Sequence, residues 1–271
     1  MSAEVTPSFH RVVLGAWLGA AAIGAGCASH GFVRPQGPSV PVRDAATLWH
    51  DVASHCDALQ AFQMQVRMTG RVGGQRLPGL TVGVIATRDG RIGLDARWSG
   101  SAVFVLGGDA NQARLVLPRD RRVIEAPAAA ILDALVGVSW DPARLMAVLS
   151  GCVAADPQVR DAVEFPDGTL AVHLSGDDVA YVVRTNGRRT VRAAESGGLG
   201  VAYRWAVEEW PAEIVIQSET GRTPSVSLTL RVEAAVANPT PDASAFTVTV
   251  PQGAEPMSIT ELRSAGPMRR P

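Results

Sequence analysis

The sequence contains no lysine, so its 25 basic side chains other than histidine are all arginines. They are matched by 26 aspartates and glutamates, and the formal net charge is −1. Proteins that bind nucleic acid through their surface normally carry a clear positive excess. The charge balance therefore argues against a nucleic-acid partner.

The sequence also lacks the common motifs of catalysis. It has no nucleophile elbow, no phosphate-binding loop and no Cys-x-x-Cys pair. His50 and His55 are five positions apart on a predicted helix, whereas metal-binding pairs prefer a spacing of three or four. We expect a protein that is not an enzyme and that needs no cofactor or metal.

The first thirty residues have the parts of an export signal. Arg11 precedes the apolar run 12–23, and small residues follow this run up to Cys27. The run is shorter than the roughly 20 apolar residues of a membrane-spanning helix, and no later segment reaches that length. A cysteine directly after small residues resembles the signal of bacterial lipoproteins, although Gly24 stands where a leucine is usual.

We therefore predict that residues 1–26 are a lipoprotein signal peptide and that Cys27 becomes the acylated N-terminus. Its acyl chains would anchor the protein to a membrane without a spanning segment. Ala28 stands where inner-membrane lipoproteins usually carry Asp, which favours the periplasmic face of the outer membrane. The alternative is an ordinary signal peptide that is cut near Ala25 or Ala28.

The remainder of the chain is expected to form a tether and one domain. Residues 27–41 are rich in Gly, Pro and Ser, which is typical of a flexible tether. Residues 42–265 are long enough for one β-rich domain with its own core. Its first element is a predicted helix over 44–59, with Asp44 as the capping residue and an apolar stripe that includes Leu48 and Val52.

Apolar residues then alternate with period two in two arrays, which predicts β-strands. Strands of the first array are expected at residues 80–87, 92–98, 102–106, 113–117 and 121–125. The second array begins at Leu170. Apolar faces in it are expected from Val179, Tyr181 and Val183, from Val191 and Ala193, and in a last strand from Phe246, Val248 and Val250. Short polar turns between the strands indicate an antiparallel meander.

Residues 127–151, between the arrays, have a helical pattern instead. Pro127 suits the first position of a helix and Gly137 its C-terminal cap. Asp141 and Pro142 start a second helix, which ends at Gly151.

About ten or eleven strands with one apolar face must curve to bury that face, and two short helices cannot bury their own apolar stripes. We therefore expect a mainly β fold: an unclosed antiparallel β-barrel, or half-barrel, with the helices against its concave side as a lid. Such a shell encloses an apolar cavity if the helices do not fill it.

Residues 92–151 resemble the outer-membrane lipoprotein receptor LolB and its soluble partner LolA. The resemblance rests on the strand pair IGLDARWSGSAVFVLGG, on the strand pair and helix NQARLVLPRDRRVIEAPAAAILDALVG, and on the helix DPARLMAVLSG. It implies an unclosed barrel whose cavity receives lipoprotein acyl chains. It also implies a lipid-anchored receptor that takes its ligand from a soluble LolA-like carrier. The C-terminal segment SITELRSAGPMRRP has no counterpart in the family.

The resemblance implies a diffuse, apolar ligand site. Candidates on the strands are Val82, Val84, Ile92, Leu94, Phe104, Leu106, Val172, Leu174, Tyr181, Val183, Val201, Tyr203 and Leu228. Candidates on the lid are Ile131, Leu132, Leu135, Leu145, Met146 and Leu149. The alternative for each of them is ordinary core packing.

The receptor family also carries an exposed apolar residue in a turn that is implicated in handing the lipid to the membrane. The matching position is Ser99, and Trp98 lies beside it. A tryptophan suits a membrane interface because its ring is apolar and its N–H can stay hydrated. The alternative is that Trp98 belongs to the core at the end of a strand.

Cys56 and Cys152 are the two cysteines that the predicted anchor leaves over. Spare thiols in an exported protein often pair, and this pair would join the first helix to the end of the lid. The alternative is two buried free thiols.

The sequence thus predicts a lipid-anchored half-barrel that binds the acyl chains of lipoproteins or lipids. Other readings remain open: a binding module for another amphiphile or a periplasmic subunit of an export machine, and a structural lipoprotein with a filled barrel. An apolar cavity of several hundred Å³ would favour binding.

Overall fold

A computed structural model of the chain describes residues 32–153, 158–185, 187–205, 210–218 and 225–265. The predicted signal peptide and Cys27 lie outside these residues. Contacts divide the chain into Met1–His30 and Gly31–Pro271, and the second unit alone is described below. No helix within the described residues is both long and apolar enough to cross a membrane.

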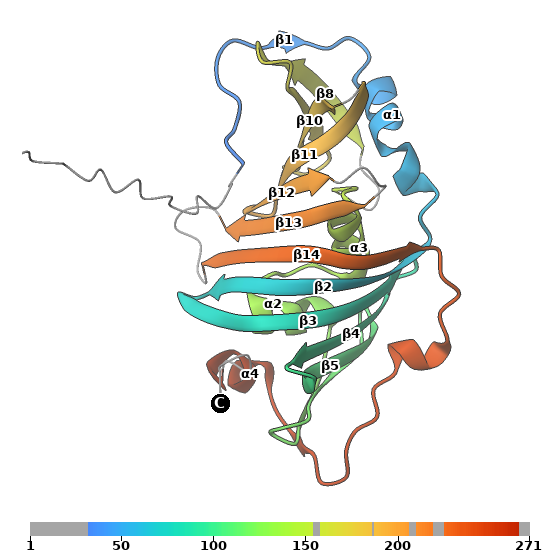
Figure 1. Cartoon of the computed structure of the whole chain (residues 1–271), viewed down its shortest axis with the longest axis vertical. Coiled ribbons are helices and arrows are strands. Elements are labelled where there is room, and N and C mark those ends of the chain that lie inside the picture. The colour runs from blue at the N-terminus through green and yellow to red at the C-terminus, as the bar shows by residue number, and fades with distance from the viewer. Residues whose placement is uncertain (1–31, 154–157, 186, 206–209, 219–224, 266–271) are drawn as a thin grey trace, which may run out of the picture. The chain divides into compact units, whose positions relative to one another are not determined.

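The unit is built on one 15-stranded sheet (Figure 1). Its strands are β1 Val40–Pro41, β2 Ala61–Val72, β3 Gln75–Thr87, β4 Arg91–Trp98, β5 Ser101–Asp109, β6 Ala113–Leu117, β7 Arg122–Ala126, β8 Val159–Glu164, β9 Leu170–Leu174, β10 Val179–Thr185, β11 Arg188–Ser196, β12 Leu199–Trp205, β13 Pro211–Ser218, β14 Val226–Ala237 and β15 Glu255–Pro256.

The sheet consists of two meanders, as the two arrays predict. One runs from β2 to β7 and the other from β8 to β14, and β14 joins them by pairing with β2 from Val226↔Val72 to Ala237↔Phe62. Every pairing is antiparallel except the short β15–β7 contact. The strand order is linear, with β1 and β15 at its ends, so the predicted mainly β, unclosed half-barrel is confirmed.

The helices are α1 Ala45–Asp57, α2 Ala128–Val136, α3 Pro142–Ser150 and α4 Ile259–Ala265, with a 3₁₀ helix, η1, at Ala243–Phe246. The predicted ends of the lid helices hold: Gly137 and Gly151 take the left-handed conformation, and the Asp141 carboxylate accepts a hydrogen bond from the Arg144 amide. Pro127 caps α2 rather than starting it. Asp44 precedes α1 but makes no side-chain cap, which corrects that expectation.

One face of the sheet, together with α2 and α3, forms the main core. Strand β2, which the sequence analysis did not predict, is an example. Its buried residues Phe62, Met64 and Val66 alternate with exposed polar residues, so only one face of the strand contributes to the core. Figure 1 shows α2 and α3 against the same side of the sheet, where they cover this apolar face.

The prediction of a last strand over Phe246, Val248 and Val250 is wrong. Phe246 ends η1, and residues 247–250 belong to no strand. The Asp242 carboxylate accepts a hydrogen bond from the Ser244 amide, which starts the 3₁₀ turn instead. Residues 238–265 form what we call the C-terminal strap.

The strap follows the sheet and ends on the lid. The Ala245 carbonyl lies so close to Gly93 that a Cβ atom there would be 2.1 Å from it, and Arg91 covers the Phe246 ring. The amides of Glu255 and Met257 then donate to carbonyls of Arg121 and Val123 at the β7 edge. Finally α4 packs against α2.

Part of the predicted flexible tether is also held on the sheet. The Phe32 ring packs on Tyr181, with 4.5 Å between the ring centroids, and Val40–Pro41 pairs with β8. Arg34 also forms an ion pair with Glu195 of β11. Residues 32–41 are therefore attached to the domain at three points, despite their Gly- and Pro-rich composition.

Candidate functional site

An apolar cavity of about 80 Å³ lies between the sheet and the lid, at the junction of the two meanders. Every residue that lines it is apolar. The lining residues on the sheet are Val66, Met68, Val82, Val84, Leu94, Phe104, Ile216, Leu228 and Leu230. Those on the lid are Leu132, Leu135, Val136, Val138, Trp140, Leu145 and Leu149.

The structure brings a group of the predicted residues to this cavity. They are Val82, Val84, Leu94, Phe104, Leu132, Leu135, Leu145, Leu149 and Leu228. They come from both meanders and both lid helices, which is the arrangement that the resemblance implies. That they contact a ligand stays a prediction.

Other predicted residues lie in the same core without lining the cavity. They are Ile92, Leu106, Ile131, Met146, Val172, Leu174, Val201 and Tyr203. Met146 faces a different pocket, described below.

Tyr181 and Val183 correct the prediction, because they lie on the opposite face of the sheet. Tyr181 packs with Ala171 and Ala193 in a separate outer cluster, whereas Ala180 and Val182 belong to the main core. The alternation in β10 was read in the right period but assigned to the wrong side.

Val191 and Ala193 were expected on one face, but a β-bulge separates them. The register between β10 and β11 shifts between Tyr181 and Val182, so Arg192 is the extra residue. Val191 therefore joins the main core and Ala193 the outer cluster.

Burial and the negative charge of Glu195 raise the pKa of Tyr181 to about 12.

A tyrosine hydroxyl is buried close to Arg144 of α3. The Tyr203 hydroxyl has no hydrogen-bond partner within the described residues, and burial raises its pKa although Arg144 acts in the opposite direction. Arg144, at the start of α3, donates to Asp178 at 2.6 Å and also to Ser196. These contacts fasten the N-terminal end of α3 to the second meander.

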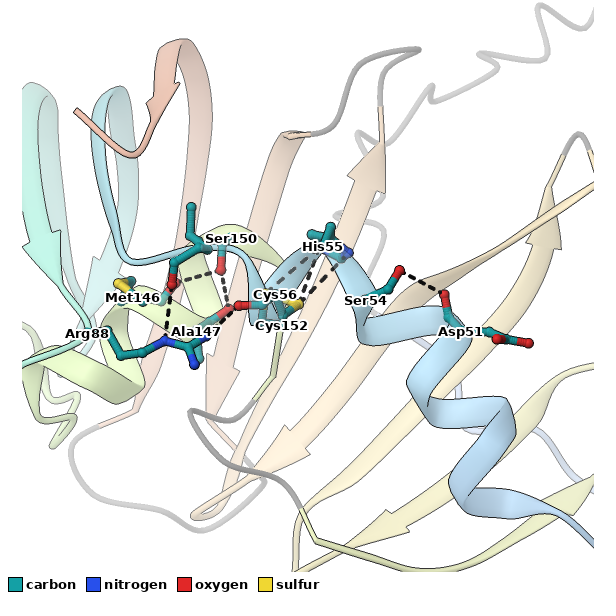
Figure 2. Close-up of a disulfide and its surroundings, with 10 residues drawn as sticks. Asp51, Ser54, His55, Cys56, Arg88, Met146, Ala147, Ser150 and Cys152 are labelled. Atoms are coloured by element: carbon teal, nitrogen blue, oxygen red, sulfur yellow. Dashed lines mark hydrogen bonds between the residues drawn. A yellow bond between two sulfur atoms is a disulfide. The ribbon is translucent and has the colours of Figure 1, made fainter.

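Cys56 and Cys152 form a disulfide, with 5.7 Å between their Cα atoms (Figure 2). The bond joins the end of α1 to the second residue after α3. It lies in the wall of a pocket of about 320 Å³ between α1, α3 and β8, which Trp49, Arg88 and Met146 also line. Arg88 donates to the carbonyls of Leu59 and Cys56 and so closes off the end of α1.

His55, Cys56 and Cys152 are the one group of three metal-ligating side chains found within the described ranges. The His55 Nε2 atom lies 3.4 Å from one sulfur and 3.8 Å from the other. Both sulfurs are bonded to each other, so in this state they offer no thiolate to a metal.

The predicted handover turn lies at the end of the β4–β5 hairpin. Ser99 is exposed and has a φ of 49°. Trp98 is partly buried against the main core, and the Arg119 guanidinium lies 5.6 Å from its ring centroid. Trp98 thus has both a core contact and a partly accessible ring.

Several residues that line the cavity were not predicted, although the alternation of apolar residues along their strands could have identified them. Val66 and Met68 belong to the alternating run of β2, Ile216 to the run of β13 and Leu230 to the run of β14. Val138 and Trp140 lie in the loop between the lid helices, where no periodicity exists to place them.

No protein-family model matches the sequence, and no curated protein matches it significantly. Solved structures with a similar arrangement include a LolA superfamily protein from Nitrosomonas europaea, which is 13% identical, with a TM-score of 0.47 over 75% of this chain and 97% of that chain. A DUF1329 family protein from Desulfovibrio piger is 9% identical, with a TM-score of 0.47 over 76% of this chain and 98% of the other.

A third similar structure is LprF from Mycobacterium bovis, which is 13% identical, with a TM-score of 0.32 over 79% of this chain and 99% of that chain. Similarity at this level does not identify a function, which has to come from the residues of the chain itself.

Proposed function

We propose that this protein is a lipid-anchored LolA/LolB-like binding protein, not an enzyme, which holds acyl chains between its sheet and its lid. Acylation of Cys27 would place it at the periplasmic face of the outer membrane, as a receptor for lipoproteins delivered by a soluble carrier. The observation that carries the binding proposal is the cavity between sheet and lid, whose lining is apolar throughout. Acyl chains leave water for such a lining with a gain of about 0.8 kcal/mol per methylene.

The cavity has to enlarge before it can hold a chain. Its volume of about 80 Å³ is well below the roughly 300 Å³ at which ligand pockets begin. We infer that this conformation is the closed one, and that α2 or α3 moves away from the sheet to admit a ligand.

Uptake of a fluorescent fatty acid tests this proposal. Leu135 lies on α2, lines the cavity and is 4% exposed. A carboxylate at this position has no partner in the apolar lining, so Leu135→Asp should lower uptake by about tenfold or more. Leu135→Met, which keeps the volume and the polarity, should bind as the wild type does.

The matched control is Ser227→Asp, which adds the same charge on the exposed face of β14 and should leave uptake unchanged. Circular dichroism checks that each variant is folded. If Leu135→Asp does not fold, Val136→Phe fills the same cavity without adding a charge and should also reduce uptake.

The second candidate is a structural lipoprotein, which the small cavity volume favours. That candidate predicts that folded wild-type protein takes up no fatty acid, and that the lid variants differ from it in stability alone. Normal uptake by folded Leu135→Asp and Val136→Phe would also contradict a site beneath the lid.

A further inference from the structure

Four arginines gather on the β10–β11 hairpin. Arg184 and Arg188 lie at its tip and are exposed, Arg189 is partly exposed, and Arg192 is the exposed bulge residue. Within the described parts of the chain, none of the four forms an ion pair. Many arginines elsewhere in the unit do have a carboxylate partner, for example Arg114 with Glu125 and Arg263 with Asp133.

The arrangement of these charges opposes folding. Arg184 and Arg189 stand directly opposite each other on neighbouring strands, and like charges in that position destabilise a sheet. Both also line a small cavity of about 120 Å³ together with Val42 and Leu170. Glu164 lines the same cavity, but it is exposed and forms no ion pair with either arginine. An anion from outside the chain would relieve the repulsion.

The path of the chain would place the proposed lipid anchor close to this hairpin. Phe32 is packed on Tyr181, and Tyr181 precedes Arg184 by three residues on β10, a distance of about 10 Å along the strand. Cys27 precedes Phe32 by five residues, which span at most about 18 Å. An acylated Cys27 would therefore keep this hairpin within reach of the lipid surface.

We propose that the β10–β11 hairpin docks on the phosphate groups of an anionic phospholipid surface through Arg184, Arg188 and Arg189. The position of the membrane rests on the proposed lipid anchor, whereas the charge of the hairpin does not. Docking would orient the domain on the membrane as well as tethering it. Figure 1 shows β1 and β8 at the same end of the sheet as β10 and β11.

The test uses the full chain with Cys27→Ala, so that the outcome does not depend on acylation. Its binding is measured to vesicles of phosphatidylcholine alone and to vesicles that also contain phosphatidylglycerol. Binding to the anionic vesicles should exceed binding to the neutral ones and should fall at high salt. Changing Arg184, Arg188 and Arg189 together to Gln should weaken the anionic binding by about 100-fold.

The matched control changes Arg67, Arg71 and Arg76 to Gln on the β2–β3 hairpin. These three are also exposed and without an ion pair in the described residues, so the loss of charge is identical. The control should retain its preference for anionic vesicles. An equal loss in both triple variants would show general charge attraction and overturn the proposal, as would a wild type that binds both vesicles equally.

Two further outcomes would reassign the hairpin. Displacement from the vesicles by inorganic phosphate, at constant ionic strength, would indicate a site for the free ion. Self-association that disappears in the hairpin variant would indicate a second copy of the chain as the partner. Because fatty-acid uptake by the hairpin variant is measured separately, failure of the docking surface is distinguishable from failure of the cavity.

Discussion

The two lid helices cover the same cavity but are held in different ways. At its C-terminal end α3 is followed by Cys152, which is bonded to Cys56, and at its N-terminal end Arg144 contacts Asp178. It also packs against β3, β4 and β13. By contrast, α2 packs chiefly against α4, and an exposed ion pair between Asp133 and Arg263 adds to that contact.

This difference indicates which helix opens. Moving α3 would require breaking a covalent bond or distorting α1. Moving α2 requires that the short helix α4 detach from it and that its contacts with β6 and the sheet separate, but no covalent bond has to break. We therefore expect α2 to be the moving part of the lid and α3 to be its fixed part. The strap ends in α4, within the C-terminal segment for which the family resemblance has no counterpart, and we expect its contact with α2 to control access to the cavity.

The largest effect is expected from the disulfide. Cys56 and Cys152 are 96 positions apart, and closing a loop of that length stabilises a fold by about 4 kcal/mol. Cys56→Ala with Cys152→Ala should lower the free energy of unfolding by that amount, measured by urea denaturation. Reductant should shift the wild type towards the variant and leave the variant unchanged.

The same variant sharpens the comparison of the helices. If α3 is the fixed part, the folded variant should take up fatty acid at nearly the wild-type rate once the loss of stability is allowed for. A much faster uptake than that of the wild type would show instead that the disulfide restrains the moving part.

Weakening the contact between the strap and α2 is expected to reduce stability less than removal of the disulfide does, and to change fatty-acid uptake more. Leu262 of α4 is fully buried, and Leu262→Ala should reduce stability by about 3 kcal/mol. Hydrogen exchange should become faster in α2 and α4 but not in α3, and fatty-acid uptake should accelerate. Thr260→Ala, an exposed change on the same helix, is the control. Unchanged exchange in α2 would contradict the role of the strap.

Sequence periodicity predicts the frame of this structure well. The two meanders follow from the alternation of apolar and polar residues. The left-handed Gly137 and Gly151 and the Asp141 cap follow from residue preferences at the ends of helices. The missed strand β2 had the same signal, since Phe62, Met64, Val66 and Met68 alternate with polar residues.

Other features depend on contacts that periodicity does not contain. Alternation in β10 shows that Tyr181 and Val183 share a face, but it does not show whether that face is inner or outer. Part of the cover of the outer face comes from Phe32, far away in the chain. The cavity itself depends on how closely Leu135 and Leu145 approach the sheet, which no pattern specifies. Helix α4 was predictable, because Ser258 and Glu261 have the spacing of a capping box.

The smallest effect is expected from that capping box, and it depends on pH. The Glu261 carboxylate accepts hydrogen bonds from the Ser258 amide at 2.7 Å and the Ser258 hydroxyl at 2.8 Å. These bonds, with the charge of Arg122 as a minor cause, hold the pKa of Glu261 below its ordinary value of 4.5. A lowered pKa in the folded state stabilises α4 above that ordinary value, and the contribution is lost as the pH falls through the folded pKa.

Glu261→Ala should therefore weaken the strap slightly at neutral pH and have almost no effect at a pH well below the folded pKa of Glu261. Urea denaturation of the two proteins at both pH values measures the difference, and hydrogen exchange in α2 locates it. Glu255→Ala is the control, because it removes a carboxylate that faces the same Arg122 but does not cap α4. A difference between wild type and Glu261→Ala that is equally large at both pH values would mean that packing, and not the ionised cap, fastens α4 to the lid.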